Sequence, residues 1–189
     1  MKPADLCKHP SSWFSGGTDV ISEVVISSRV RLARNIAGYE FLPCLTTDRQ
    51  SELQARLKKT LLNLNFAEKV EFFDIDQAAD VERTLLTERH LISHRHAKGS
   101  GPRGVIIAED ETFTAMINEE DHLRIQVYAA GLQLHSCFQR INRIDDAIEN
   151  KLEYAFDNRL GYLTACPTNV GTGIRVSVML HLPALKMTR

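Results

Sequence analysis

The sequence has no apolar run of the roughly 18 to 20 residues that a membrane-spanning helix needs, and its first residues lack the apolar core of a secretory signal. Its four cysteines form no Cys-x-x-Cys pair, which argues against a zinc site and against a disulfide framework. The formal net charge of −1 at pH 7 gives no reason to expect binding to nucleic acid or to a membrane surface. We therefore expect a cytoplasmic protein with no metal site among its own side chains.

Two common nucleotide-binding signatures are also missing. The chain has no Gly-x-x-x-x-Gly-Lys-Ser/Thr loop, and Gly171-Thr-Gly173 stands without the rest of a dinucleotide fingerprint. His90, His94 and His96 are close together, but the segment 98–103 that follows them favours an exposed loop over a metal site. A phosphate-binding site in this chain must therefore be built in another way.

The composition is that of an ordinary globular domain, with 43% hydrophobic and 25% charged residues in a chain of 189. Alternating patterns predict strands at residues 23–32, 70–74, 104–108, 113–117, 123–127, 161–164 and 174–182. Apolar steps of three and four predict helices over 47–65, from Asp76 toward His90, and over 134–155. We expect an α+β domain, 23–189, with a mainly antiparallel sheet and flanking helices. An irregular tail, 1–22, precedes it, and Trp13 and Phe14 attach this tail to the domain.

Four arginines share one property, since each lies on the non-aliphatic side of an alternating strand. They are Arg29, Arg31, Arg124 and Arg175. If these strands join one sheet whose apolar face is covered by the long helices, the four guanidinium groups line one open surface. Such a surface suits a polyphosphate, because each guanidinium offers forked donors and stays charged at any working pH. The alternative is that they are ordinary exposed arginines that blunt a sheet edge.

Three consecutive acids, from Glu119 to Asp121, separate two of the predicted strands. An extended chain through the acids would place Glu120 on the same side as Arg124, together with Asn118 and His122, and would turn Glu119 away. A carboxylate next to a guanidinium suits an enzyme that takes a proton and holds an anion in one place. The alternative is a solvated hairpin turn.

Three motifs together resemble the ATP:guanidino phosphotransferases, the family of creatine and arginine kinases. They are Asn-Glu-Glu-Asp-His-Leu-Arg at 118–124, Cys-Pro-Thr-Asn-Val-Gly-Thr at 166–172 and Ser-Ser-Arg-Val-Arg-Leu-Ala-Arg-Asn at 27–35. Within the family the chain is most similar to the bacterial protein-arginine kinases. The resemblance runs from about Glu23 to the C-terminus and implies the phosphagen-kinase catalytic fold, which is glutamine-synthetase-like. In that family the catalytic domain continues further, with another phosphate-binding arginine loop and a second acceptor-side carboxylate, so we expect the domain here to be C-terminally incomplete.

The resemblance also implies roles for individual residues. Glu120 matches the carboxylate that holds the acceptor guanidine and takes its proton, and Cys166 matches the cysteine beside that guanidine. We expect a polarised thiolate at Cys166 that does not act as a covalent nucleophile. The alternative for a lone thiol is a small buried apolar side chain. The nucleotide-contacting histidine of the family falls on Arg95, between His94 and His96. The nucleotide-binding positions are Ser27, Ser28, Arg29, Val30, Arg31, Arg124, Arg175, Val176, Ser177, Val178 and Met179.

These features predict a kinase that uses Mg²⁺ and ATP to phosphorylate arginine side chains of proteins. Kinases of small guanidines carry a separate helical domain before the Ser27-Ser28 motif, and the short segment here leaves an open acceptor side suited to a polypeptide. Two alternatives are a kinase of a small free guanidino compound and a non-catalytic nucleotide-binding or regulatory fragment. We expect neither nucleic acid nor membrane as a partner, and an unpaired last strand, 174–182, would favour a homo-oligomer.

Overall fold

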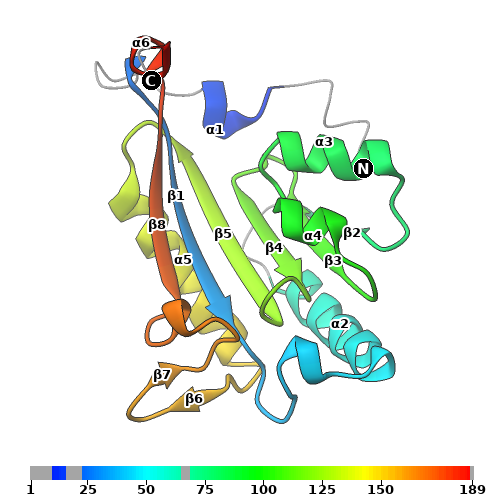
Figure 1. Cartoon of the computed structure of the whole chain (residues 1–189). Coiled ribbons are helices and arrows are strands. Elements are labelled where there is room, and N and C mark those ends of the chain that lie inside the picture. Colours follow the sequence, from blue (N-terminus) through cyan, green and yellow to red (C-terminus); the bar gives the residue numbers. More distant parts are fainter. Residues whose placement is uncertain (1–9, 16–22, 65–68, 188–189) are drawn as a thin grey trace.

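The computed structural model describes residues 10–15, 23–64 and 69–187, which build a six-stranded antiparallel sheet with helices on both faces (Figure 1). The strand order is β2-β3-β4-β5-β1-β8. The strands are β1 (Val25–Arg34), β2 (Val70–Asp74), β3 (Gly104–Ala108), β4 (Phe113–Ile117), β5 (Leu123–Ala130) and β8 (Ile174–Leu180). The helices are α1 (Ser12–Ser15), α2 (Thr47–Leu62), α3 (Asp80–Glu88), α4 (His94–Lys98), α5 (Leu134–Glu149) and α6 (Pro183–Met187). The predicted α+β class with a mainly antiparallel sheet is confirmed.

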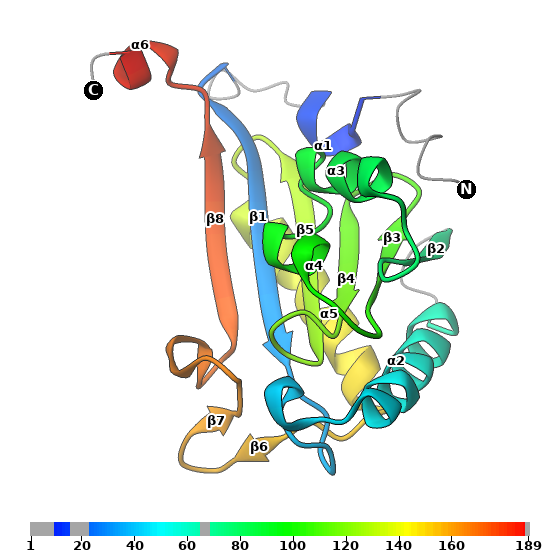
Figure 2. The ribbon, with the colours of Figure 1, turned by 45° about the vertical axis from the view of Figure 1, so that its right-hand side comes forward.

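One face of the sheet is covered by α2 and α5, which pack on it through apolar stripes (Figure 2). Leu53, Leu57 and Leu61 recur at four-residue steps along α2, so they lie on one side of the helix and are fully buried. Burying each such leucine stabilises the fold by roughly 1.5 to 3 kcal/mol. Val30 and Ile125 contribute to this core from the middle of the sheet, which explains the apolar alternation of their strands.

The opposite face is covered only over half of its width. There α3, α4 and the turn between them pack against β2, β3 and β4 through a second core that includes Leu86, Leu91, Val105, Ile107 and Met116. On this face β5, β1 and β8 carry the polar side chains of their alternating pattern instead. The consequence is an open half-face beside a helical wall, and the candidate site lies on it.

A buried ion pair fixes α5 to the end of β1. Arg34 lies on the α5 side of the sheet, and its guanidinium approaches the Asp145 carboxylate at 2.6 Å. Arg34 also donates to the Thr172 carbonyl oxygen at 2.9 Å and stacks on Tyr162, 3.6 Å from the ring centre. Tyr162 belongs to β7 (Gly161–Tyr162), which pairs with β6 (Phe156–Asp157) in a separate two-stranded sheet. Strand β1, α5 and the segment before β8 are thus held together at one point.

Several helix limits differ from those predicted, for local reasons. The predicted helix 134–155 ends at Glu149, because Asn150 caps it and the chain turns, although Leu152 and Tyr154 still pack into the core. The helix predicted from Asp76 begins at Asp80, since residues 76 and 77 donate their backbone N–H groups to the Asp74 side chain in a turn.

The other helix limits shift less. The α2 cap is Thr46, one residue before the predicted position, and the helix ends at Leu62, three residues before the predicted limit. The last three predicted positions include residue 65, which lies outside the described part of the chain.

The strand patterns also differ in three places. A bulge between Val25 and Ser27 reverses the early parity of β1, so Val25 is buried and Val24 is 45% exposed. The strand predicted at 161–164 is limited to Gly161–Tyr162. Strand β8 was expected to bury its aliphatic side, but Val176 and Leu180 are 48% and 49% exposed, since α5 packs under β1 and β5 while β8 lies at the sheet edge.

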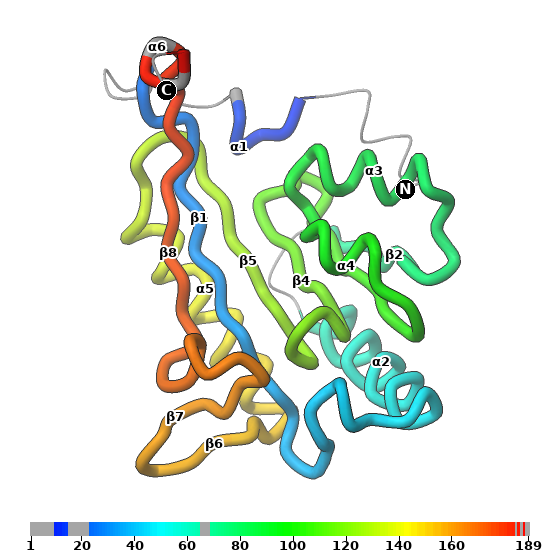
Figure 3. Tube along the Cα trace, viewed as in Figure 1, coloured from blue at the N-terminus to red at the C-terminus, as the bar shows by residue number. Residues whose placement is uncertain are grey.

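The predicted tail is partly described. Within residues 10–15, Ser12–Ser15 form a helical turn, α1, which packs near one end of β5 and β1 (Figure 3). Trp13 is buried at 4% exposure, as expected, whereas Phe14 is 59% exposed and does not help to attach the tail. In the described parts of the chain, no helix is long and apolar enough to span a membrane.

Candidate active site

The four arginines singled out by strand alternation converge on the open half-face. Arg31 of β1 lies directly opposite Arg175 of β8 in the strand register. On the other edge of β1, Arg124 of β5 lies opposite Ala33, two residues after Arg31. Arg29 continues the row and donates through Nε to Ser177 Oγ at 3.2 Å. Three strands that are distant in sequence therefore deliver their cations to one surface, as predicted.

Arg31 is at the centre of this group. Burial, reinforced by repulsion from Arg124, Arg29 and Arg175, lowers the pKa of Arg31 to about 10, so the group remains charged at neutral pH. Its Nε atom is buried and has no hydrogen-bond partner among the described residues. An unpaired buried donor surrounded by like charges is costly, and a bound polyanion would remove both costs. The arginine surface therefore fits a phosphate chain.

A pocket of about 160 Å³ opens beside these arginines. Its walls include Arg31, Arg124 and Arg175 together with Glu120 and Cys166, the two residues expected to act on the acceptor. Carboxylate, thiol and guanidinium groups thus face one small space. The pocket is the part of the described structure where anion binding and proton acceptance can occur side by side.

The acidic turn does not follow the predicted parity. Arg124 Nη1 donates to Glu119 Oε2 at 3.0 Å, so the acid expected to point away is its direct partner. The reason is Asn118, whose φ of 58° ends the extended conformation. A tight turn follows, in which the Asn118 N–H donates to the His122 carbonyl oxygen at 2.9 Å. The Asn118 side chain bonds instead to the carbonyl oxygens of Gln50 and Pro102.

Glu119 is a buried positioning group that sequence reasoning missed. Its side chain is 2% exposed and accepts hydrogen bonds from Ser93 Oγ at 2.6 Å and from Arg124. Burial by itself would raise the pKa of Glu119, but Arg124 and the Ser93 hydrogen bond outweigh it, and the net pKa is lowered. The carboxylate therefore stays charged and holds Arg124 on the sheet surface. No signal in the sequence distinguished it from Glu120, because only the turn geometry does so.

The helix α4 contradicts the exposed loop expected around His94 and His96. Ser93 caps it, and His96 is buried with Nε2 bonded to the Gly104 carbonyl oxygen at 3.1 Å. Arg95, one of the three candidates for the position of the family's histidine, donates to Glu120 Oε1 at 2.9 Å. No group of three or more possible metal ligands occurs among the residues described.

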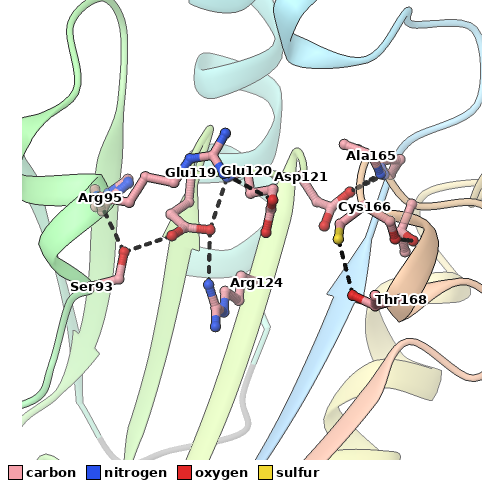
Figure 4. Close-up of polar contacts among 12 residues, drawn as sticks. Ser93, Arg95, Glu119, Glu120, Asp121, Arg124, Ala165, Cys166 and Thr168 are labelled. Carbon is pink, nitrogen blue, oxygen red and sulfur yellow. Dashed lines mark hydrogen bonds and ion pairs between the residues drawn. The ribbon is translucent and has the colours of Figure 1, made fainter.

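The loop that carries Cys166 is tied to the acidic turn through Asp121 (Figure 4). Asp121 Oδ1 accepts hydrogen bonds from the Ala165 backbone N–H at 2.7 Å and from Asn35 Nδ2 at 2.6 Å. Cys166 Sγ lies 3.0 Å from Thr168 Oγ1. Asp121 is 2% exposed, so this is an internal brace that sets the distance between the cysteine and the carboxylate.

His122 is a structural residue of the same turn. It was expected on the Arg124 side, but it is fully buried, accepts from the Ile36 N–H through Nδ1 and bonds to the Glu40 carbonyl oxygen through Nε2. Burial lowers the pKa of His122 and keeps the ring neutral at pH 7. Its role is to attach the acidic turn to the chain that follows β1.

Gly173 explains how β8 approaches β1 beside the pocket. Its φ is 64°, and a Cβ atom built on it would lie 2.6 Å from the Ala33 carbonyl oxygen. The Ala33 N–H donates to the Gly173 carbonyl oxygen at 2.9 Å. Only glycine permits this close contact in the left-handed region, and two residues later the strand presents Arg175.

A second pocket, of about 230 Å³, continues along the open half-face. It is lined by the predicted positions Ser27, Arg29, Ser177, Val178 and Met179, and by three residues that sequence reasoning did not assign to the site, Trp13, His90 and Tyr128. The side chains of Ser28 and Val30 lie on the α5 face, and Val176 pairs with Val30 there. These three do not reach either pocket through their side chains.

Comparison with known proteins shows the family to which the chain belongs. The family model of the ATP:guanido phosphotransferase C-terminal catalytic domain matches residues 52–189. The chain belongs to this family. A protein-arginine kinase of Symbiobacterium thermophilum is 43% identical over 188 residues, which cover 98% of this chain and 53% of that protein. A protein-arginine kinase of Brevibacillus brevis is 46% identical over 183 residues, which cover 95% of this chain and 50% of that protein. The chain thus spans about half the length of these curated relatives.

Solved structures of the same family superpose closely. The duplicated taurocyamine kinase from Schistosoma mansoni, with bound transition state analog components, has a TM-score of 0.80 at 27% identity, covering 97% of this chain and 29% of that one. Lombricine kinase has a TM-score of 0.76 at 28% identity, covering 97% of this chain and 53% of the other. The predicted phosphagen-kinase fold is therefore confirmed for this chain.

Proposed function

We propose that this chain belongs to a kinase that transfers the γ-phosphoryl group of ATP to a guanidinium nitrogen of arginine side chains in proteins. The observation that carries the proposal is the single pocket that Arg31, Arg124, Arg175, Glu120 and Cys166 line together. Phosphoryl transfer depends mainly on positioning and on charge stabilisation, which a surface of fixed guanidinium groups supplies.

The nucleotide fits along the open half-face. Its phosphates would lie on Arg31, Arg124 and Arg175, where the unpaired Nε of Arg31 meets a phosphate oxygen. Arg29 and Ser177 lead from this surface into the second pocket, which would take the base. In this arrangement Ser27, Val178 and Met179 contact the base side, whereas Ser28, Val30 and Val176 support the strands.

Mg²⁺ would enter together with the nucleotide. This ion prefers octahedral oxygen coordination, and in kinases substrate phosphates commonly provide much of it. With Mg²⁺ bound, part of the phosphate charge is neutralised and the bridging oxygens are polarised for transfer. The arginines then hold the remaining phosphate oxygens.

The transfer itself needs an acceptor next to Glu120. The guanidinium nitrogen loses a proton to the Glu120 carboxylate and attacks the γ-phosphorus. An N–P bond forms while the bond from phosphorus to the bridging oxygen breaks, and ADP leaves with that electron pair. Glu119 takes no proton in this scheme, because it is bonded to Arg124 and Ser93. Cys166 lies on the same pocket and contacts the acceptor without forming a covalent bond to phosphorus.

Two observations bear on the acceptor. Relatives named protein-arginine kinase are 42 to 46% identical to the chain, which favours a protein side chain. The solved taurocyamine and lombricine kinases are only 27 to 28% identical, so a small guanidino compound is the second candidate. The third is a nucleotide-binding module without transfer activity.

One experiment separates the three candidates. A catalytically complete form of the protein is incubated with Mg²⁺-ATP and either an arginine-rich protein, free arginine or no acceptor, and acid-labile phosphate is measured by ³¹P NMR. The chain itself, which spans about half the length of its curated relatives, is tested for ATP binding. Phosphoarginine on the protein alone supports the proposal, and phosphate on free arginine supports the second candidate. ATP binding without transfer in every arm leaves a binding module, and no ATP binding overturns all three. Arg124→Ala serves as the control that removes the phosphate surface.

A further inference from the structure

We propose that Trp13, in the short helix before the catalytic sheet, forms a wall of the nucleotide-base pocket and favours purine over pyrimidine nucleotides. The inference rests on the proposed function and deepens it. It would make the N-terminal segment a part of the nucleotide site and not merely a tail lying on the domain.

The aromatic geometry is the first support. Trp13 stacks on Tyr128 with ring centres 5.5 Å apart and planes 25° apart, and it meets His90 edge-on at 6.0 Å. All three side chains line the pocket of about 230 Å³. Tyr128 is itself fixed, since its hydroxyl donates to the His90 carbonyl oxygen at 2.5 Å. Aromatic side chains that line a pocket are common contacts of nucleotide bases.

The pocket is continuous with the arginine surface, which is the second support. Arg29 lines the aromatic pocket and is two residues before Arg31 on the same strand, a step of roughly 6.6 Å along the sheet. On β8, Ser177 stands in the same relation to Arg175. Phosphates held at Arg31 and Arg175 would therefore place a sugar near Arg29 and Ser177, and a base against Trp13.

Trp13 is held in place from outside the site. Ser11 Oγ donates to Glu111 Oε2 at 2.5 Å, and the buried Glu111 is paired with Arg89 at the end of α3. Ser12 Oγ donates to the Asp110 carbonyl oxygen at 2.5 Å. Two consecutive serines thus attach α1 to the β3–β4 turn. This attachment orients Trp13 toward the pocket while Phe14, the next residue, faces solvent.

The chemistry of the walls matches a purine. The Trp13 indole N–H is buried and donates to no described residue, and a purine offers ring nitrogens that accept hydrogen bonds. Burial, together with repulsion from Arg29, lowers the pKa of His90, so this ring is neutral at pH 7. A fused purine is larger than a single pyrimidine ring, so it fills more of the pocket of about 230 Å³ and contacts more of its aromatic lining.

The test uses the fact that Trp13 is the one tryptophan of the sequence. ATP, CTP and inorganic tripolyphosphate are titrated by calorimetry and by intrinsic fluorescence. We expect all three to bind, ATP tighter than CTP, with tryptophan emission changing on addition of ATP but not of tripolyphosphate. ATP binding that leaves the emission unchanged would overturn the proposal.

Variants complete the test. Trp13→Ala should weaken ATP binding by about tenfold, in the range of a lost base–aromatic stack, without changing tripolyphosphate binding. Trp13→Phe should keep most of the affinity, and Phe14→Ala, on the same turn, is the matched control. If Trp13→Ala lowers stability, Ser11→Ala is the second variant, because it loosens the attachment of α1 outside the pocket. We expect it to lower ATP affinity by less than Trp13→Ala does. Wild-type affinity in both variants refutes the role of Trp13, whereas failure of wild type to bind ATP and tripolyphosphate refutes the proposed function.

Discussion

The carboxylate of Glu119 lies 3.0 Å from the guanidinium of Arg124, on the side of the sheet that also carries Arg29, Arg31 and Arg175. Glu119 is almost completely buried, whereas Glu120 is partly exposed and pairs with the exposed Arg95. Two adjacent acids therefore have different physical tasks. Glu119 fixes a cation within the arginine surface, whereas Glu120 lines the pocket and is the carboxylate that we propose for the acceptor.

The first prediction follows from this difference. Glu119→Gln leaves Arg124 partly buried and unpaired among three other arginines, so the free energy of unfolding should fall by about 2 to 3 kcal/mol. Urea denaturation of the ligand-free protein measures the loss. Glu120→Gln is the matched control and should change stability by less than about 1 kcal/mol, because its pair with Arg95 is exposed. In a catalytically complete form, Glu120→Gln should instead cut turnover by about two to four powers of ten. Equal stability loss in both variants would contradict the assignment.

Arg175 should matter to the ligand and not to the fold. It is exposed and faces Arg31, so Arg175→Ala removes repulsion and should leave the melting temperature of the ligand-free protein unchanged or higher. ATP binding should weaken by about 1.5 to 3 kcal/mol, the range for hydrogen bonds to charged groups. Arg175→Lys should restore only part of it, because the fork of donors is lost. A clear drop in the ligand-free melting temperature would assign Arg175 a structural role instead.

Arg95 should compete with the acceptor. Its guanidinium is bonded to Glu120 at 2.9 Å and is largely exposed, so the pair contributes little to stability. Removing it in Arg95→Ala should lower the KM for the acceptor by up to about fivefold, which corresponds to the roughly 1 kcal/mol limit for such pairs. ATP affinity should not change. Arg95→Lys keeps the competing charge and is the control, and an unchanged acceptor KM in the alanine variant would contradict the prediction.

Asp121 should control access to Cys166. Asp121→Ala leaves the Ala165 N–H without its acceptor, at a cost of about 1 to 3 kcal/mol, and removes one of the two acceptors of the Asn35 amide, which keeps the Leu163 carbonyl oxygen. The loop is then released, and alkylation of Cys166 by iodoacetamide, followed by peptide mass spectrometry, should become faster. Cys44 is exposed elsewhere and serves as the internal reference. Asp121→Asn retains an acceptor oxygen and should behave nearly as wild type.

His96 should make stability depend on pH. Burial lowers its pKa from 6.5 to about 4, so below pH 6.5 the unfolded chain binds a proton that the folded chain does not. Stability is therefore lost as pH falls from 6.5 toward 4, by about 2 kcal/mol between pH 7 and pH 5 from this residue. Urea denaturation at the two pH values should show a smaller difference in His96→Gln than in wild type. His94→Gln, on the exposed side of α4, is the control and should keep the wild-type difference.

The sequence by itself determined those features that depend on local periodicity. Alternation along Val25–Arg34 and Ile174–Leu180 placed Arg29, Arg31 and Arg175 on one face, because successive side chains of a strand point to opposite sides. The steps of three and four in α2 and α5 likewise predicted which face of the sheet would be covered. These relations extend over neighbouring residues only, so the order of the residues is enough to predict them.

The tertiary structure decided what periodicity does not reach. Parity through the acidic turn failed because Asn118 adopts a left-handed conformation, and the partner of Arg124 became Glu119. Burial of His96 and the place of Trp13 beside Tyr128 depend on segments far apart in the chain that pack together. The physical reason is the same in each case: a side chain's direction after a turn, and its neighbours across the sheet, are set by long-range contacts that no local pattern encodes.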